Sequence, residues 1–485
     1  MSANLNLQQD DRPPRIAKLL IDGEWIEGEG TADLRDKFTG APVAKIAQAT
    51  RAHVARAVAG THAAFKRGGL APYERYEALM RAADILESRK QEVKDAIVAE
   101  AGFTYNDAER EVQRTGQTLR SSGEEARRLQ GDMIPLQGAP NQGGRIGFTI
   151  RVPLGVVCAI TPFNAPLNTT AHKVAPALAA GNAVVLKPAT YTPLTSVILC
   201  EILIEAGFPK DFIALIHGPG GKIGQWLAEE EAIRFYTFTG STEVGTRIQA
   251  GAGLRRTQME LGSIASTIVC DDADLAAALP KIVAACFRKA GQMCTSIQRL
   301  YVQDAVFDRF RDMLVDAVND LVVGNPHDAK TVVGPMIDAK EAERAQSWID
   351  EAVAAGAKVL TGGKREGPLL YPTVLTDIDK SMAVMSREIF APVVNLVRFT
   401  DFDAALDDVN DTPYGLATGI FTNDLAKAFT ASRKLEVGGV HINETSNSRV
   451  DLMPYGGCKA SGFGQEGPRY AMKELTEERL VTINA

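Results

Sequence analysis

Three polar residues stand where predicted strands or helices end, and each could do chemistry there. Cys294 closes the segment GQMC, with Arg288 and Lys289 a few positions before it. A thiolate is a nucleophile, although most single cysteines only pack. Glu260, in MELGS, ends a predicted strand, where a carboxylate is either a solvated side chain or a general base facing a cleft. Lys187, in KPAT, is either a surface lysine or a half-buried one that needs an anionic or hydroxyl partner.

Two glycine-containing turns connect predicted strands to predicted helices. The first is GPGGKIG (218–224), and the second is TFTGSTEVG (237–245), where Ser241 and Thr242 can cap a helix. Backbone N–H groups at such turns can approach a pyrophosphate at a helix N-terminus. Neither turn has the GxGxxG spacing that is typical of dinucleotide-binding sites. Each turn taken alone is also explained by a tight backbone turn or by helix capping. Two such turns on one sheet favour a dinucleotide site.

Strands and helices alternate through the middle of the chain, which predicts an α/β fold. We expect the first strands at 155–162, 182–188, 212–218 and 233–240, and the helices between them at 193–206 and 221–230. This spacing predicts a parallel, doubly wound sheet that binds ligands beyond the carboxyl ends of its strands. A second alternating series from about 260 has predicted helices at 275–290, 304–320 and 338–355, and predicted strands at 299–302, 359–362 and 395–400.

The flanking segments complete the predicted fold. Residues 1–20 are expected to form a loose arm, and apolar periodicity predicts helices at 51–68, 73–100 and 106–129. The segment 131–151 is predicted to be a hairpin. The segment ERLVTI (478–483) is predicted to be a strand without a local partner, of the kind that pairs with another subunit.

Composition excludes several function classes. The 485 residues carry a formal net charge of −7 without a basic patch, which argues against a nucleic-acid partner. The sequence contains no apolar run long enough to predict a membrane-spanning helix, and its polar first residues do not resemble a secretory signal. The six cysteines contain no CxxC pair and the six histidines are scattered, so we expect no metal site and a reduced, cytoplasmic protein.

Seven ordered segments resemble one family over nearly the whole chain, from about residue 20 onward. They are TPFN, GNAVVLKPAT, FTGSTEVG, MELGS, GQMC, EIFAPV and PYGGCKASGFG. In this order they resemble the aldehyde dehydrogenase superfamily. The sequence near the C-terminus is similar to that of the lactaldehyde, non-phosphorylating glyceraldehyde-3-phosphate and semialdehyde dehydrogenase branches of this superfamily. The resemblance implies two Rossmann-like domains with doubly wound parallel sheets, and a small β oligomerisation element.

The resemblance implies a set of catalytic roles. Cys294 matches the nucleophile, whose thiolate attacks the aldehyde carbon. Asn164 matches the side chain that, with the Cys294 backbone N–H, donates to the oxyanion. Glu260 matches the base that activates water to hydrolyse the thioester, and Lys173 resembles a lysine that relays the proton.

The resemblance also implies a site for NAD or NADP. The residues expected to contact the cofactor, around the glycine turn that includes Gly218, are Thr161, Pro162, Phe163, Lys187, Thr190, Gly220, Gly224, Gly240, Ser241, Leu261, Glu388 and Phe390. Among these, Lys187 resembles a ribose-binding lysine. Glu388 resembles the carboxylate that holds the nicotinamide ribose, with Phe390 beside the ring.

Several positions depart from the family pattern. Ser263 and Ala391 stand where glycines are usual, and Phe163 replaces a frequent tryptophan. Thr190 stands where NAD-preferring members often carry a glutamate that repels a 2′-phosphate. We therefore expect that NADP is accepted.

Arginines point to the substrate class. Arg288 resembles an arginine that grips the carboxylate in semialdehyde dehydrogenases, if the helix continues that far. Arg449 lies in a segment that resembles the one lining the substrate funnel in the family, and Arg120, on the 106–129 helix, could also face that funnel. Thr295 is the fourth predicted substrate residue. A guanidinium suits carboxylate, sulfonate or phosphonate groups, so we expect a small anionic aldehyde such as a semialdehyde or a phospho-, phosphono- or sulfo-aldehyde. Pairing of each arginine with an internal carboxylate, and a neutral hydroxyaldehyde such as lactaldehyde, are the alternatives.

Other function classes remain open. A CoA-acylating aldehyde dehydrogenase would not need Glu260 as a base. An alcohol-oxidising Rossmann enzyme would need a zinc site or a YxxxK motif, which does not follow the first Rossmann-like unit. A non-catalytic binding protein on the same fold would be expected to lack Cys294 or Asn164, and both are present.

We expect three structural parts. A dinucleotide-binding domain comprises 15–128 and 152–259, and a catalytic domain comprises 260–460. An oligomerisation element comprises 129–151 and 470–485, and would make a homodimer or homotetramer.

Overall fold

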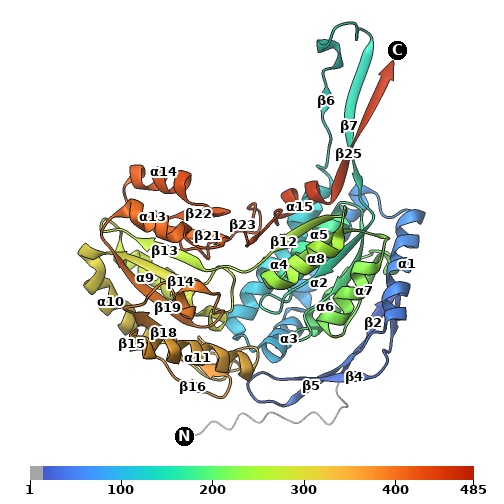
Figure 1. Cartoon of the computed structure of the whole chain (residues 1–485). Helices are drawn as coiled ribbons and strands as arrows, with labels where there is room; N and C mark the ends of the chain where they lie inside the picture. Colours follow the sequence, from blue (N-terminus) through green and yellow to red (C-terminus); the bar gives the residue numbers. More distant parts are fainter. Residues whose placement is uncertain (1–14, 485) are drawn as a thin grey trace.

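The computed structural model describes residues 15–484, which form two helix-flanked sheets and a long projecting arm (Figure 1). The predicted N-terminal arm up to residue 14 and residue 485 lie outside the described residues. Both α/β sheets consist largely of parallel strands, so the predicted fold class is confirmed.

The first sheet has eight strands in the order β24-β12-β11-β8-β9-β10-β2-β3. The five strands from β12 to β10 are mutually parallel, and the outer pairings are antiparallel. The strands are β2 (Leu19–Ile21), β3 (Glu24–Ile26), β8 (Val156–Ile160), β9 (Ala183–Lys187), β10 (Ile213–Leu215), β11 (Ile233–Thr239), β12 (Arg256–Glu260) and β24 (Gly462–Phe463).

Helices cover both faces of this sheet, so alternate strand residues enter different cores. Val157 and Ala159 of β8 pack in one core, while Val156 and Cys158 pack in the other. The helices are α1 (Arg51–Arg67), α2 (Pro72–Ser88), α3 (Lys90–Ala101), α4 (Tyr105–Ala126), α5 (Asn168–Ala179), α6 (Leu194–Glu205), α7 (Gly220–Glu229), α8 (Thr242–Ala252) and α15 (Pro468–Glu474).

The helix predicted over 73–100 is two helices, α2 and α3, which is a correction. They meet at Arg89, whose φ of −99° and ψ of 12° leave the helical region. Neither Gly nor Pro marks this break, and the buried positions continue on both sides of it. The apolar period therefore gave no sign of the break.

The second sheet has seven strands in the order β15-β18-β19-β14-β13-β21-β22, all parallel except β15. The strands are β13 (Ala265–Val269), β14 (Ile297–Gln303), β15 (Lys358–Thr361), β18 (Thr373–Thr376), β19 (Val393–Phe399), β21 (Ala417–Phe421) and β22 (Gly439–Ile442). The helices of this half are α9 (Leu275–Phe287), α10 (Asp304–Asn319), α11 (Ala339–Ala354), α12 (Ala383–Ser386), α13 (Phe402–Asn410) and α14 (Leu425–Lys434).

The projecting arm contains β6 (Met133–Ile134), β7 (Arg145–Pro153) and β25 (Thr476–Asn484), with β7 between the other two (Figure 1). The C-terminal segment forms the predicted strand, and the prediction that this strand has no local partner is confirmed. It pairs antiparallel with β7 at nine positions. The partner segment lies more than 300 residues away in the sequence, so no local pattern indicates the pairing.

Shorter elements complete the fold. Three small sheets contain β1 (Arg15–Ala17), β4 (Thr31–Arg35) and β5 (Pro42–Ala47); β16 (Arg365–Glu366) and β17 (Leu369–Leu370); and β20 (Tyr414–Gly415) and β23 (Cys458–Lys459). In residues 15–484, no helix combines the length and apolar character that crossing a membrane requires.

Candidate active site

A cavity of 1120 Å³ lies at the carboxyl ends of the parallel strands β8, β9, β11 and β12. Its other wall comes from α4 and from segments of the second half of the chain, near residues 288–295, 336–344, 388–390 and 447–455. This is the edge of a doubly wound sheet where ligands are expected. The cavity is therefore formed by segments from both sheets.

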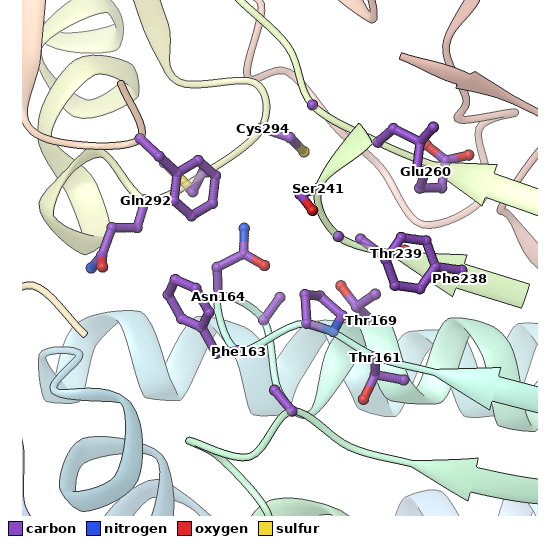
Figure 2. Close-up of a pocket in the computed structure, with 18 of the residues that line it drawn as sticks. Thr161, Phe163, Asn164, Thr169, Phe238, Thr239, Ser241, Glu260, Gln292 and Cys294 are labelled. Carbon is purple, nitrogen blue, oxygen red and sulfur yellow. The ribbon is translucent and has the colours of Figure 1, made fainter. Parts of the chain in front are cut away.

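Cys294 lines the cavity from the connection between α9 and β14 (Figure 2). The idea that α9 continues toward Cys294 is wrong, because Arg288 has ψ of 147° and ends the helix. Lys289 and Ala290 follow with φ of 51° and 53°, and Gly291 with φ of 68°. A Cβ on Gly291 would lie 2.1 Å from the Ala391 backbone oxygen, so only glycine fits this close approach.

The surroundings of Cys294 oppose its ionisation. Removal from water raises the pKa of the Cys294 thiol to about 11, while a hydrogen bond with Tyr455 acts in the opposite direction. The Cys294 Sγ and the Tyr455 Oη are 3.0 Å apart. Arg288 and Lys289, which precede Cys294 in the sequence, pair with the carboxylates of Asp107 and Glu111.

Asn164 lines the same cavity from the loop between β8 and α5, and Figure 2 shows its side chain facing the space beside Cys294. Its backbone oxygen accepts a hydrogen bond of 2.7 Å from Lys289 Nζ. Lys289 also pairs with Glu111 at 2.6 Å, and Glu111 accepts the N–H groups of Leu167 and Asn168. The loops that carry Cys294 and Asn164 are thus tied together through a buried ion pair.

Glu260 ends β12 and lines the cavity. Among the described residues, neither of its buried carboxylate oxygens has a hydrogen-bond partner. Burial and the nearby Glu466 carboxylate raise the pKa of Glu260 well above its ordinary value, although Lys173 and Arg449 act against this. A carboxyl group of this kind can accept a proton nearer to neutral pH than an exposed one.

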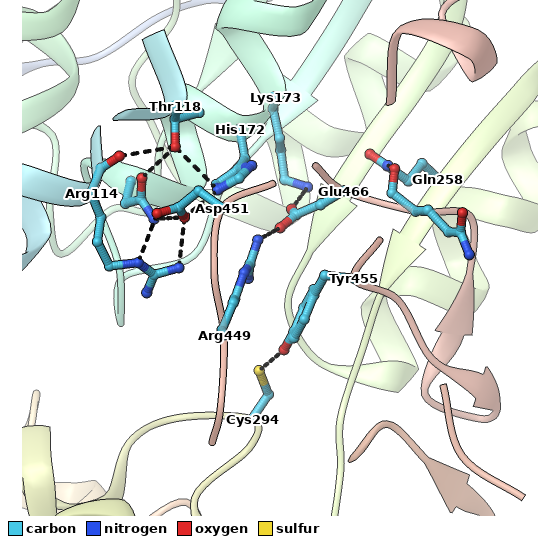
Figure 3. A network of polar contacts seen from close by, with 12 residues as sticks. Arg114, Thr118, His172, Lys173, Gln258, Cys294, Arg449, Asp451, Tyr455 and Glu466 are labelled. Carbon is cyan, nitrogen blue, oxygen red and sulfur yellow. Dashed lines mark hydrogen bonds and ion pairs between the residues drawn. The ribbon is translucent and has the colours of Figure 1, made fainter. Parts of the chain in front are cut away.

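Lys173 lies in α5 behind Glu260 and does not line the cavity. Its Nζ donates to Glu466 Oε1 at 3.0 Å (Figure 3) and also to Thr237 Oγ1 at 3.0 Å. Glu466 lines the cavity and also accepts from Arg449 at 2.7 Å. Any influence of Lys173 on Glu260 therefore depends on charge and on Glu466.

The predicted cofactor residues line the cavity, apart from Gly218. The turn at the start of α7 is open, because a Cβ on Gly221 or Gly224 would meet nothing within 4 Å. Ser241 caps α8, the second helix that begins at the cavity. The two helix N-termini, with their exposed N–H groups, fit a pyrophosphate between them.

Lys187 ends β9 and Thr190 follows it, both beside this turn. Lys187 is buried, which lowers the pKa of its amine to about 8, and its Nζ donates to the Pro188 backbone oxygen at 2.9 Å. Thr190 Oγ1 donates to the Gly218 backbone oxygen at 3.3 Å. An uncharged threonine side chain therefore occupies this edge of the cavity.

Glu388 and Phe390 lie across the cavity from these strands. Removal from water raises the pKa of Glu388 to about 7, and one of its oxygens accepts the Ser263 backbone N–H at 2.9 Å. Phe390 has φ of 50° and meets Phe163 edge to face, with ring centroids 5.9 Å apart. The two aromatic rings are in contact with each other and both line the cavity.

The predicted substrate arginines differ in position. Arg288 lines the cavity and pairs through Nε with Asp107 at 2.9 Å, and Arg449 lines it and pairs with Glu466. Arg120 does not line it, which corrects the expectation, because its guanidinium pairs with Asp84 of α2 at 2.7 Å. Thr295 lines the cavity and donates to Asn447 at 2.8 Å.

A profile of the aldehyde dehydrogenase family matches residues 25–481. The chain belongs to the aldehyde dehydrogenase family. The predicted resemblance and the predicted enzyme class are therefore confirmed. In residues 15–484 no group of three or more His, Cys, Asp or Glu side chains could hold a metal ion.

Two relatives illustrate the aldehydes that named members of the family oxidise. A 3-sulfolactaldehyde dehydrogenase from Priestia megaterium is 46% identical over 466 residues, which are 96% of this chain and 98% of that protein. A lactaldehyde dehydrogenase from Methanocaldococcus jannaschii is 36% identical and covers 96% of this chain and 100% of its own.

Solved aldehyde dehydrogenase structures have the same fold. An aldehyde dehydrogenase from Physcomitrella patens in complex with the product succinate has a TM-score of 0.95 at 37% identity, covering 98% of this chain and 99% of its own. A glyceraldehyde-3-phosphate dehydrogenase from Methanocaldococcus jannaschii in complex with NADP has a TM-score of 0.91 at 35% identity. The match covers 94% of this chain and 100% of that protein.

Several cavity residues of this aldehyde dehydrogenase escaped the sequence reasoning. They are Arg110, Arg114, Asn447, Tyr455 and Glu466. Arg110 and Arg114 are four residues apart on one predicted helix, so their shared face was a usable signal. Tyr455 lies inside the quoted segment PYGGCKASGFG, but its contact with Cys294 spans 161 positions of sequence.

Proposed function

We propose that this aldehyde dehydrogenase oxidises a small anionic aldehyde to the corresponding carboxylic acid, with NAD or NADP as the hydride acceptor. The observation that carries the substrate class is Arg110. Its exposed side chain lines the cavity, and among residues 15–484 it has no ion pair. A guanidinium without an internal carboxylate is available to a sulfonate, phosphonate or carboxylate group of the substrate.

Arg288 supports the same substrate class. It bonds to Asp107 through Nε alone, so its terminal nitrogens make no hydrogen bond within the described residues. Arg114 and Arg449 also line the cavity, but they are already paired with Asp451 and Glu466 and are less available to a substrate anion. The 46% identity to a protein named for sulfolactaldehyde favours a sulfonated aldehyde within this class.

The catalytic roles follow from the positions around Cys294. Its thiolate attacks the aldehyde carbon, and the amide of Asn164 and the Cys294 backbone N–H donate to the oxyanion that develops. NAD or NADP, when bound, takes the hydride. Glu260 then accepts a proton from the water that attacks the remaining thioester, which releases the acid and restores the thiol. The unpartnered carboxylate of Glu260 supports water as the acceptor rather than CoA.

The cofactor residues support both dinucleotides. The open turn at Gly221 and Gly224 and the capped start of α8 would hold the pyrophosphate, while Lys187 and Glu388 would hold the two riboses. Thr190 places no negative charge beside the adenosine ribose, so NADP is accepted as well as NAD.

The arm supports a homodimer or homotetramer. Its strands expose large apolar side chains, at Met133, Ile146, Leu480 and Ile483. A three-stranded sheet standing away from the body leaves edges that another subunit can pair with. Light scattering of the purified chain measures the number of subunits.

The test is a comparison of aldehydes of similar size and different charge. We expect kcat/KM for 3-sulfolactaldehyde, succinate semialdehyde or glyceraldehyde 3-phosphate to exceed that for lactaldehyde by at least about tenfold, equal to about 1.4 kcal/mol. Each aldehyde is assayed with NAD and with NADP, with and without CoA. An equal or higher kcat/KM for lactaldehyde contradicts the anionic substrate, and an acyl-CoA product contradicts the hydrolytic reaction.

A further inference from the structure

Tyr455 contacts the nucleophile of the proposed reaction directly. It lies in the segment between β22 and β23, and its Oη is 3.0 Å from Cys294 Sγ (Figure 3). Both residues line the cavity. The sulfur therefore has a hydroxyl group within hydrogen-bond distance before any substrate binds.

The Tyr455 ring is held in place from two sides. Its backbone N–H donates to the Glu466 backbone oxygen at 3.1 Å, and the Glu466 N–H donates back at 2.7 Å. The guanidinium carbon of Arg449 lies 3.8 Å from the ring centroid, and Arg449 is itself paired with Glu466. This packing aims the hydroxyl at the sulfur, so little ordering is needed when the thiolate forms.

Either atom can donate while Cys294 is a neutral thiol, but once Cys294 is a thiolate only Tyr455 can donate, because the sulfur then carries no proton. Withdrawal of the hydroxyl from water, together with negative charge that develops on Cys294, raises the pKa of Tyr455 well above its ordinary value. The phenol therefore keeps its proton when the thiol has lost its own. An O–H donated to a charged sulfur is stronger than one donated to a neutral thiol, so the contact favours the thiolate.

The other charged groups near Cys294 do not make this contact redundant. After removal from water, the Tyr455 hydrogen bond is the largest influence on the pKa of Cys294. The negative charges of Glu388 and Glu260 raise that pKa, and the positive charge of Arg449 lowers it. A thiolate here has two acidic neighbours, and Tyr455 is the group that bonds to it.

We propose that Tyr455 is a catalytic residue that donates its hydroxyl hydrogen bond to the Cys294 thiolate and so raises the fraction of nucleophile ready to attack. Tyr455 keeps its proton throughout, and no covalent bond forms to it. The proposal rests on Cys294 being the nucleophile of the proposed function, but not on the identity of the aldehyde.

The test is the alkylation of Cys294 in wild type and in Tyr455→Phe, which keeps the ring. Rate constants for iodoacetamide and N-ethylmaleimide are measured from pH 6 to 10, and Cys294 is followed by peptide mass spectrometry so that the other five cysteines do not contribute. A lost hydrogen bond to a charged group raises the thiol pKa by about one to two units, so both reagents should react about 10 to 100 times more slowly at each pH.

The matched control is Tyr371→Phe, which removes an exposed hydroxyl that donates to Glu366. It should leave both rate constants unchanged. Thermal unfolding and NADP binding, followed by fluorescence, establish that Tyr455→Phe is folded. An unchanged alkylation rate, or a slowing that differs between the two reagents and so reflects access, overturns the role of Tyr455. A Cys294→Ser variant that keeps full activity would instead refute the proposed function.

Discussion

Lys289 Nζ lies 2.6 Å from a carboxylate oxygen of Glu111 and 2.7 Å from the backbone oxygen of Asn164. Both ionic side chains are more than nine-tenths buried. Glu111 also accepts two backbone N–H groups at the start of α5, from Leu167 and Asn168. One ion pair therefore fixes the Cys294 loop against the loop that carries Asn164, the proposed oxyanion donor.

Glu111→Gln should destabilise the chain and slow its turnover. The substitution leaves the Lys289 charge buried without its carboxylate, which costs about 3 to 5 kcal/mol in comparable buried pairs. The Asn164 loop also loses part of its tether, so kcat should fall more than KM changes. Urea unfolding measures the first effect and steady-state kinetics the second. The control is Glu87→Gln, which removes an exposed pair with Lys90 and should change neither; equal unfolding midpoints for both variants would contradict the prediction.

Glu260→Gln should stop the reaction after the hydride has left. Gln has nearly the same shape but cannot take a proton from water, so hydrolysis of the thioester should slow by about 10² to 10⁴. The first turnover does not need this base. Stopped-flow absorbance should therefore record one equivalent of reduced cofactor per active site, followed by a very slow steady state. Loss of the burst itself would place Glu260 before hydride transfer and contradict its role as the hydrolytic base.

As the pH is lowered, the steady-state rate of the wild type should begin to fall at a higher pH than it would if the base were an ordinary exposed glutamate. Burial raises the pKa of Glu260 well above 4.5, so as pH falls Glu260 takes up a proton early and can no longer accept one from water. The acid limb of kcat should therefore lie well above pH 4.5, while the burst amplitude is retained at the same pH. An acid limb near pH 4.5 in both quantities would indicate that an exposed carboxylate, and not Glu260, limits the reaction.

The sequence motifs predicted more of the site than the periodicity of apolar residues did. Cys294, Asn164 and Glu260 come from three separate motifs, and the structure places all three on one cavity. Periodicity identified the strands β8 to β11 because each is a short apolar run between turns. It did not reveal the break at Arg89 or the partner of β25, because neither leaves a local pattern.

The substrate side was harder to predict because it depends on which face of a helix is turned inward. The helix of Arg120 was expected from the sequence, but the packing of α2 against α4 decides which arginine faces the cavity. Arg110 and Arg114 line the cavity, and Arg120 pairs with α2. Tyr455 and Glu466 lie in connecting segments, where they form an isolated antiparallel bridge with each other that no local sequence pattern indicates. Only the folded chain shows that they lie beside Cys294.

Arg110→Gln should weaken the preference for anionic aldehydes. Loss of the unpaired guanidinium removes one charge interaction with the substrate, so kcat/KM for 3-sulfolactaldehyde should fall at least about tenfold, about 1.4 kcal/mol, while that for lactaldehyde stays the same. Arg120→Gln is the matched control, because it removes an arginine of the same helix that does not line the cavity. Equal losses for charged and neutral aldehydes would indicate a general defect and contradict a role in charge recognition.

Thr190→Glu should shift the cofactor preference of the enzyme toward NAD. The introduced carboxylate would stand beside Lys187 at the edge of the cavity, where it repels a 2′-phosphate and accepts the hydroxyls of an unphosphorylated ribose. Like charges placed together at a binding site cost several kcal/mol, so kcat/KM with NADP should fall by at least about 10²-fold, and that with NAD should be kept or raised. Thr190→Gln is the control, because it introduces a side chain of similar size without a charge. It should alter the ratio of kcat/KM with NADP to kcat/KM with NAD far less. If both variants leave the ratio of NADP to NAD turnover unchanged, residue 190 does not contact the adenosine ribose, and the expected acceptance of NADP needs another structural basis.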